Sequence, residues 1–166
     1  MTSKCARMGG LYLTLRALAA FVAILSTFIV LSPKLMEVEA LHVKYLMGLL
    51  GLRVVAVSSS LIIPDHNPVT ITITVECSGF LTASLLLALM LAPPRVSAKD
   101  RAWGCVKGLA LIYLANVLRI CMIIAFYRLW GEEALHFAHR VLGGIMMFSV
   151  TISYWALWAK DKLLRA

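Results

Sequence analysis

The sequence predicts an all-α membrane bundle of four to five transmembrane helices with a small extracytoplasmic β-hairpin. Three observations point to this fold class: apolar stretches recur along the chain, basic residues cluster beside them, and two β-branched runs flank a loop that contains proline. Of the 166 residues, 61% are hydrophobic and 14% are charged, and the mean hydropathy is +0.90. Because a soluble domain has about 25% charged residues, this composition excludes an ordinary soluble protein. The length fits a single domain over residues 1–166.

Four apolar stretches are candidate membrane spans, since a helix needs about 20 residues to cross a hydrocarbon core about 30 Å thick. In chain order they are Leu11–Leu31, Gly79–Leu91, Gly104–Tyr127 and Val141–Ala159. The second is too short to span unless Cys77 and Ser78 lie at its mouth. We therefore expect the second helix to start below the membrane surface.

Two further segments bear on the number of spans. Leu41–Val57 is apolar but contains His42, Lys44 and Arg53, so we interpret it as interfacial or as packed against other helices. If it were a span, the orientation of everything after it would change. Val38-Glu39-Ala40 loosely resembles a signal-peptide cleavage site. Because the first apolar stretch is long for a signal peptide and ends well before that site, we expect an uncleaved anchor.

The distribution of charge predicts the orientation. The N-terminal segment, the loop after the second stretch and the C-terminal tail together carry ten basic and two acidic residues, a net charge of +8. The other two loops carry five basic and six acidic residues, a net charge of −1. With four spans, the positive-inside rule puts both termini in the cytoplasm of the cell. The basic residues flank the spans and do not form one stripe, so they do not indicate a nucleic-acid surface.

Two β-branched runs precede the second apolar stretch. Arg53–Ile63 and Val69–Val75 are both predicted to be strands, and Pro64–Pro68 lies between them. The alternation of Thr and Ile in the second run is typical of a half-exposed strand. A hairpin with open edges cannot lie in lipid. We therefore expect it to cover the extracytoplasmic mouth of the bundle.

The four cysteines are Cys5, Cys77, Cys105 and Cys121. The predicted topology places only Cys77 at the extracytoplasmic mouth, so a disulfide partner for it is not evident. No Cys-x-x-Cys pair or zinc-like spacing is present, and His136 with His139 is a weak metal signal. The sequence therefore predicts neither a metal nor another cofactor.

Three polar residues are expected at a similar depth in the outer half of the membrane. Arg119 lies inside the third span, where a charged side chain usually faces a partner or a polar cavity. Asn116 is one turn before it, on the same helix face. His139 begins the fourth span and is followed by Gly143-Gly144, where two helices can approach closely. Cys77, at the mouth of the second span, completes the group of three with Arg119 and His139.

These residue types suit acyl transfer. A neighbouring imidazole can remove the proton of a thiol, and a nearby cation can stabilise the thiolate. An arginine can stabilise the oxyanion of a tetrahedral intermediate or bind a substrate carboxylate. Glu76 would work against a thiolate at Cys77 if it is ionised nearby.

Other interpretations remain open at this level. Cys77 can be a packing residue, and Ser78 can simply begin a helix. Arg119 and His139 can pair with a partner helix or with anionic lipid in a small membrane subunit that is not an enzyme. A transporter or channel component is a third class, which the short inventory of polar residues disfavours.

The chain resembles the exosortase/archaeosortase family of integral-membrane cysteine transpeptidases. The resemblance rests on Glu-Cys77-Ser-Gly at the start of one span, Asn116-x-x-Arg119-Ile in the next, and His139-x-x-x-Gly143 entering the last. It covers about residues 50–150, which would form the catalytic core. Many members have around eight spans, whereas this chain is predicted to have four or five.

The resemblance implies an activity and partners. Such enzymes recognise exported proteins whose C-terminal tail holds a short motif, one span and a basic cluster, cleave near the motif, and transfer the new carboxyl end to an acceptor, often lipid-linked. Cys77 would be the nucleophile, Arg119 would stabilise the oxyanion or orient the thiolate, and His139 would be the general base or acid. Arg140 competes with His139, because archaeal members can use an arginine in that role. Asn116, Glu76 and Ser78 would be supporting residues.

Overall fold

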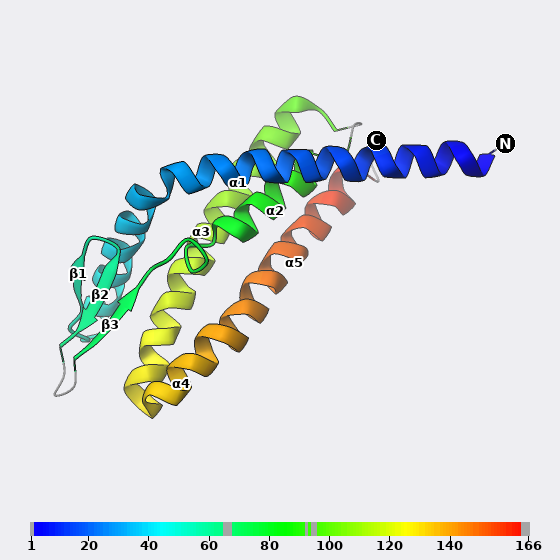
Figure 1. Cartoon of the computed structure of the whole chain (residues 1–166). Coiled ribbons are helices and arrows are strands. Elements are labelled where there is room, and N and C mark those ends of the chain that lie inside the picture. The colour runs from blue at the N-terminus through cyan, green and yellow to red at the C-terminus, as the bar shows by residue number, and fades with distance from the viewer. Residues whose placement is uncertain (1, 65–67, 92, 94–95, 164–166) are drawn as a thin grey trace.

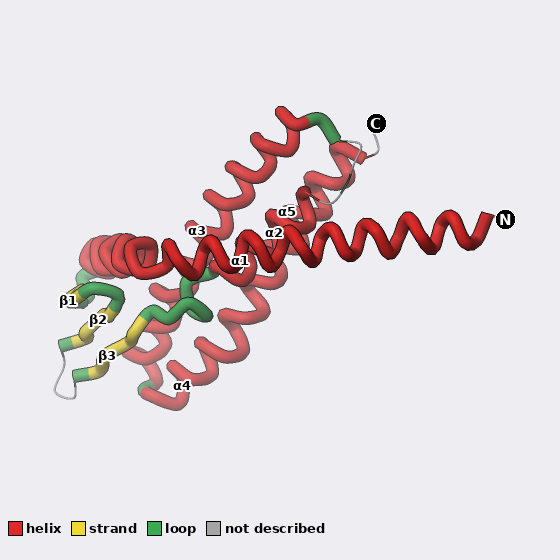
Figure 2. The backbone as a smooth tube through the Cα atoms, turned by 45° about the horizontal axis from the view of Figure 1, so that its top comes forward, coloured by secondary structure: helices red, strands yellow, loops and turns green. Residues whose placement is uncertain are grey.

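The structure, a computed structural model, describes residues 2–64, 68–91, 93 and 96–163; the side chains of residues 2–14, 16–17 and 162–163 lie outside this description. Its elements are α1 (Thr2–Leu49), β1 (Val55–Val57), β2 (Ser60–Ile63), β3 (Val69–Thr72), α2 (Phe80–Leu91), α3 (Ala98–Trp130), α4 (Glu132–Phe137), a π-helix η1 (Ala138–Leu142) and α5 (Gly143–Leu163). Figures 1 and 2 show three strands grouped beside an otherwise helical chain. Cys5 and the middle of the predicted Pro64–Pro68 loop fall outside the described residues and side chains.

Helix α1 joins two of the predicted segments. It continues past the first apolar stretch and takes in Leu41–Leu49, so most of the ambiguous fifth stretch is part of the first helix. Pro33 lies inside α1, and Figure 1 shows the helix bending between its blue and cyan parts. A proline within a helix removes one backbone hydrogen bond and favours such a bend.

Three helical segments of the described chain are long and apolar enough to cross a membrane. They are Leu18–Leu49, Ala98–Trp130 and the continuous run Glu132–Asp161. Exposed leucines such as Leu111, Leu114 and Leu118 cover the outer face of α3, as expected for a surface against lipid. The chain is therefore a multi-pass membrane protein, although the predicted count of four to five spanning helices is not confirmed. The second predicted span, α2, has 12 residues, fewer than a span needs.

The strands form one antiparallel sheet in the order β1-β2-β3. Leu61 lies opposite Ala56 on β1 and opposite Ile71 on β3. The prediction of a single strand over Arg53–Ile63 is wrong, because the chain reverses at residues 58 and 59 and the run becomes a hairpin. Ser58 has φ +52° there, which is the backbone region that a two-residue hairpin turn requires. The predicted hairpin is thus a three-stranded sheet.

The buried apolar residues form two clusters that share α3. One lies between the sheet, the C-terminal half of α1 and α3. The other lies between α2, α3 and α5. Along α3, the residues of the second cluster end at Ala115 and those of the first begin at Val117. Asn116 lies where one cluster gives way to the other, and Arg119 follows one turn later, so the polar residues of α3 are enclosed by apolar packing.

Candidate active site

Cys77 lies in the turn that connects β3 to α2, as the sequence indicated. The backbone N–H of Cys77 donates a hydrogen bond to the carbonyl of Thr74 at 2.9 Å. Ser78 is buried, and its hydroxyl donates to the carbonyl of Val75 at 2.7 Å. Gly79 ends the turn at φ +70°, a conformation that side chains other than glycine's rarely adopt. The turn is therefore held by its own hydrogen bonds, and Cys77 precedes the first residue of α2, Phe80, by three positions.

The thiol of Cys77 meets the imidazole of His139. Their Sγ and Nε2 atoms lie 2.9 Å apart, and both side chains are partly buried. His139 lies in η1, a single π-helical turn between α4 and α5. Such turns add one residue to the helical repeat and occur often at functional sites. Arg140, the competing residue, is exposed, so of the two adjacent residues it is His139 that reaches the thiol.

Arg119 is 8% exposed and lies against the start of α5. A methyl group added to Gly143 would overlap Nε of Arg119. The absence of a side chain at Gly143 therefore makes the space that the guanidinium occupies. Gly144, by contrast, faces open space, so only the first of the two predicted glycines permits a close approach. The guanidinium is near enough to His139 to interact with it electrostatically.

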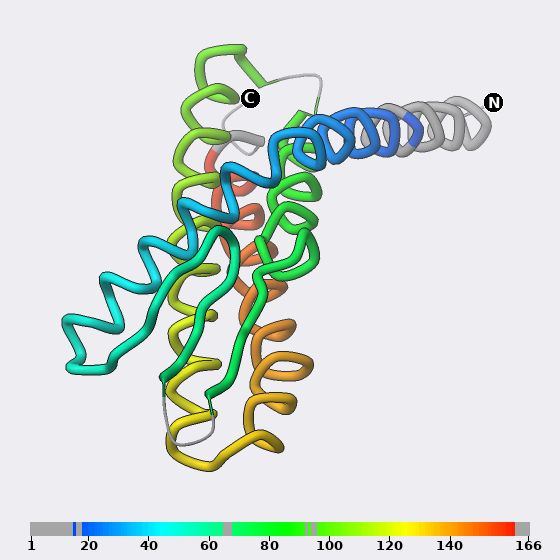
Figure 3. Tube along the Cα trace, turned by 60° about the vertical axis from the view of Figure 1, so that its left-hand side comes forward, coloured from blue at the N-terminus to red at the C-terminus, as the bar shows by residue number. Residues whose placement is uncertain are grey.

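Glu76 and Asn116 have different surroundings. Glu76 is exposed, and its carboxylate is near enough to His139 to interact with it electrostatically. Asn116 is fully buried and packs against the turn: a Cβ atom on Gly79 would lie 3.3 Å from Cβ and Cγ of Asn116. Because Asn116 lies midway along α3, this contact places the start of α2 opposite the middle of that helix, as Figure 3 also shows.

Sequence reasoning missed one buried residue, Glu39. It is one of the six acidic residues that the charge count assigns to the loops, because it follows the first apolar stretch, yet it lies within α1 and is 2% exposed. Its Oε1 accepts a hydrogen bond from Nδ2 of Asn116 at 3.2 Å. Ala40, Val43 and Met47 are buried on the same stretch of α1 at helical spacing. That spacing was the available signal, because it places Glu39 on the buried face and not in a loop.

A pocket of about 200 Å³ lies beside the Cys77 turn. Ser78, Gly79 and Glu39 contribute to its wall, and the rest is largely apolar. The apolar and aromatic lining residues are Phe28, Leu35, Phe80, Ala83, Leu109, Ile112 and Tyr113. The site therefore combines a thiol–imidazole pair, a buried guanidinium and an adjoining space suited to an apolar group.

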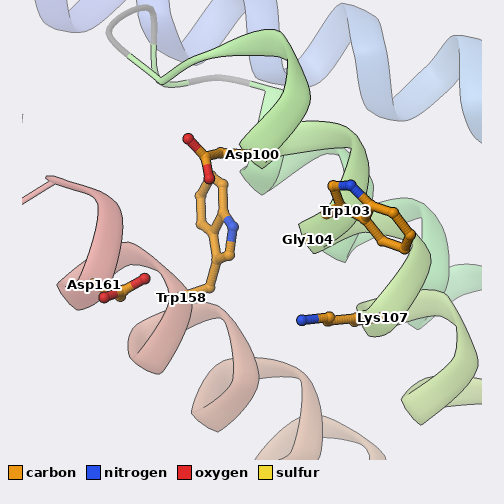
Figure 4. A pocket seen from close by; sticks show the side chains of 6 residues that line it. All are labelled: Asp100, Trp103, Gly104, Lys107, Trp158 and Asp161. Atoms are coloured by element: carbon orange, nitrogen blue, oxygen red, sulfur yellow. The ribbon is translucent and has the colours of Figure 1, made fainter.

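A larger pocket, of about 520 Å³, lies at the other end of the helices. It is lined by Asp100, Trp103, Gly104, Lys107, Trp158 and Asp161 (Figure 4). Gly104 and Arg119 are separated by 15 residues of one helix, which is about 22 Å at 1.5 Å per residue. This mixture of tryptophan and charged side chains is typical of a membrane–water interface. The pocket is therefore remote from Cys77 and does not belong to the candidate active site.

Comparison with known proteins identifies the family. The model of the family described as transmembrane exosortase matches residues 7–156. No curated protein and no solved structure matches the chain. The family match confirms the resemblance carried by the cysteine, arginine and histidine motifs and extends it beyond residues 50–150. The chain belongs to the transmembrane exosortase family.

Proposed function

We propose that this protein is a membrane-embedded cysteine transpeptidase. It cleaves the C-terminal sorting signal of exported proteins and transfers the new carboxyl end to an acceptor, through a thioester on Cys77. The single observation that carries the proposal is the 2.9 Å contact between Sγ of Cys77 and Nε2 of His139. A thiol next to an imidazole is the arrangement that cysteine acyl transfer requires. Membership of the family supports the same activity.

In the first half of the reaction, His139 accepts the proton of Cys77 and the thiolate attacks the scissile carbonyl carbon. The carbonyl oxygen becomes an oxyanion, and the buried guanidinium of Arg119 stabilises its charge. Such stabilisation is strongest where water is excluded, and Arg119 is 8% exposed. When the intermediate collapses, His139 returns the proton to the leaving amine, and the substrate's carboxyl side remains as a thioester on Cys77.

In the second half, a nucleophilic group of the acceptor attacks the thioester carbon. His139 takes the proton of that nucleophile, Arg119 again stabilises the oxyanion, and the sulfur of Cys77 leaves and is reprotonated. The free enzyme is restored, and the acceptor is joined to the new carboxyl end. A membrane lipid is the proposed acceptor, and the apolar pocket beside Ser78 and Gly79 is compatible with it.

The proposed substrates are exported proteins that end in a short motif, one span and a basic cluster. We place the active site towards the extracytoplasmic side, with both termini in the cytoplasm, because the basic residues concentrate at the termini and in the loop after α2. An exported substrate would then reach the Cys77 turn from the side on which it emerges.

The test is processing of a tagged exported protein that carries such a tail, co-expressed with the enzyme. Cys77→Ala should abolish cleavage while the protein still inserts into membranes. Cys121→Ala is the matched control, since Cys121 is a buried cysteine on α3 that packs in the sheet-side apolar cluster. Processing that survives Cys77→Ala would overturn the proposal and favour a non-enzymatic membrane subunit, in which Arg119 and His139 serve helix or lipid pairing.

A further inference from the structure

Glu39 is an acidic residue buried inside a candidate membrane span. Its side chain is 2% exposed, within the segment Leu18–Leu49. A carboxyl group in such a place is costly and usually marks a functional contact. None of the steps assigned to Cys77, Arg119 and His139 uses it, so its position calls for another explanation.

One hydrogen bond connects Glu39 to α3. Nδ2 of Asn116 donates to Oε1 of Glu39 at 3.2 Å, and both residues are buried. The second carboxyl oxygen of Glu39 and Oδ1 of Asn116 have no hydrogen-bond partner among the described residues. The polar link between these two side chains therefore depends on a single bond, which a truncated side chain at either position would remove.

Asn116 in turn contacts the turn that carries the thiol. Its Cβ and Cγ atoms would lie 3.3 Å from a Cβ atom on Gly79, which is tighter than ordinary van der Waals contact. Gly79 is two residues after Cys77 and has a backbone conformation that holds the turn. The Asn116 side chain therefore lies directly beside the backbone that follows Cys77.

The charge of Arg119 lies close to the same carboxyl group. Arg119 follows Asn116 by three residues, on the same helix face, and interacts electrostatically with Glu39. The carboxyl group thus sits near the two polar residues that α3 contributes to the site.

We propose that Glu39 is a positioning residue of the active site: by holding Asn116 against Gly79, it sets the position of Cys77 relative to His139. The chain of contacts runs from α1 through α3 to the turn before α2. The catalytic meaning of this contact chain rests on the proposed transpeptidase function. The positioning itself does not, and it can be measured without a substrate.

The test is the rate at which Cys77 is alkylated by N-ethylmaleimide in membranes, in a variant with Cys5, Cys105 and Cys121 replaced by alanine. The reagent is neutral, so a change of local charge does not alter its concentration at the site. The His139→Ala variant serves as a reference, because it gives the alkylation rate of Cys77 in the absence of the imidazole. Glu39→Ala should slow alkylation at least about 3-fold, because the thiol loses its alignment with His139. Glu37→Ala is the matched control, since Glu37 is an exposed acid two residues away on the same helix.

Four outcomes support a positioning role through Asn116. Asn116→Ala should slow the reaction as much as Glu39→Ala, and the double variant should be no slower than either, because both act through one contact. Glu39→Gln should restore most of the rate, since its carbonyl oxygen can still accept from Asn116. In the processing assay, Glu39→Ala should lower kcat more than it changes KM.

An alkylation rate for Glu39→Ala equal to that of the unsubstituted protein would overturn the proposal, as would additive effects of Glu39→Ala and Asn116→Ala. A Glu39→Gln variant as slow as Glu39→Ala would also overturn it, because the charge and not the hydrogen bond would then be decisive.

If Glu39→Ala does not accumulate in membranes, the alkylation rate of Glu39→Asp is the deciding measurement. This variant shortens the side chain by one methylene group, which moves the carboxyl group away from Asn116 and should slow alkylation of Cys77. An unchanged alkylation rate would exclude a role for the hydrogen bond between the two residues. Failure of the transpeptidase proposal would be seen in a different assay, the processing of the tagged substrate, as cleavage that survives Cys77→Ala.

Discussion

Arg119 and Gly143 share one contact in which the side chain of the arginine fills the space that the glycine leaves. A methyl group at Gly143 would overlap Nε of Arg119. Gly143 directly follows the π-helical turn that carries His139. The contact therefore places the guanidinium beside the start of α5, near His139, and limits how closely α3 and α5 approach at that level.

Gly143→Ala should impair the enzyme through this contact. The added methyl group forces Arg119 to move, and overpacking of this kind costs about 1–3 kcal/mol. We expect substrate processing to fall at least about 10-fold. The matched control is Gly144→Ala, since Gly144 faces open space and alanine favours a helix. Its activity should be unchanged and its thermal stability in detergent equal or higher; equal losses in both variants would contradict the contact.

Gly79→Ala should damage the turn that carries Cys77. A residue with a side chain at φ +70° is strained by about 1–2 kcal/mol, and its Cβ would also press on Asn116. Gly51→Ala is the control, because Gly51 has φ +75° but no atom within 4 Å of the added Cβ. Both variants should lose stability, measured by thermal unfolding in detergent, and Gly79→Ala should lose more because of the added contact with Asn116. Only Gly79→Ala should also lose processing activity.

His139→Ala should reduce processing by about 10²–10⁴-fold, the range typical of losing a general acid–base. Arg140→Ala should stay within about 2-fold of the parent, because Arg140 is exposed and His139 holds the contact with the thiol. Initial rates of cleavage of the tagged substrate in isolated membranes measure both. The reverse ranking would assign the third catalytic role to Arg140.

Arg119→Ala should lower kcat by about 10²–10³-fold, as removal of one oxyanion-stabilising donor does. Arg119→Lys retains the positive charge but not the planar fork of donors. It should recover only part of that loss. Single-turnover formation of the Cys77 thioester, followed by mass spectrometry, separates this effect from binding. Full recovery with lysine would show that charge alone is required.

The proposed orientation can be tested in a cysteine-free variant. Glu76 is exposed beside the Cys77 turn, and Lys99 is exposed near the start of α3. In intact cells, a membrane-impermeant maleimide should label Glu76→Cys from outside. Lys99→Cys should be labelled only after the cells are permeabilised. The opposite pattern would invert the assigned topology.

Much of the candidate site could be predicted from local sequence. Cys77 lies between a strand-like run and an apolar run, and Arg119 and Asn116 interrupt an apolar helix at a spacing of three. These are short-range patterns, because a helix or strand repeats its faces every few residues. They were sufficient to place three elements at one site and to indicate the family, which the family match confirms.

One error came from strand pairing, which no local pattern encodes, and the other from a helical spacing that was not used. The run Arg53–Ile63 has strand composition throughout, and only the antiparallel pairing of its two halves shows that it reverses at residues 58 and 59. Glu39 was assigned to a loop because the first apolar stretch, Leu11–Leu31, ends before it. Its burial depends on Asn116, 77 residues later.

The sequence by itself determined that this is a membrane protein of mostly helical structure, with a cysteine before one helical segment and an arginine and a histidine on the segments that follow. Composition and helical spacing are sufficient for that, since they are properties of the chain alone. Only the tertiary structure decided that His139 and not Arg140 reaches Cys77, that Gly143 and not Gly144 makes room for Arg119, and that Glu39 supports Asn116. Each of these depends on the rotation and packing of one helix against another, and adjacent residues on a helix differ by about 100° in direction.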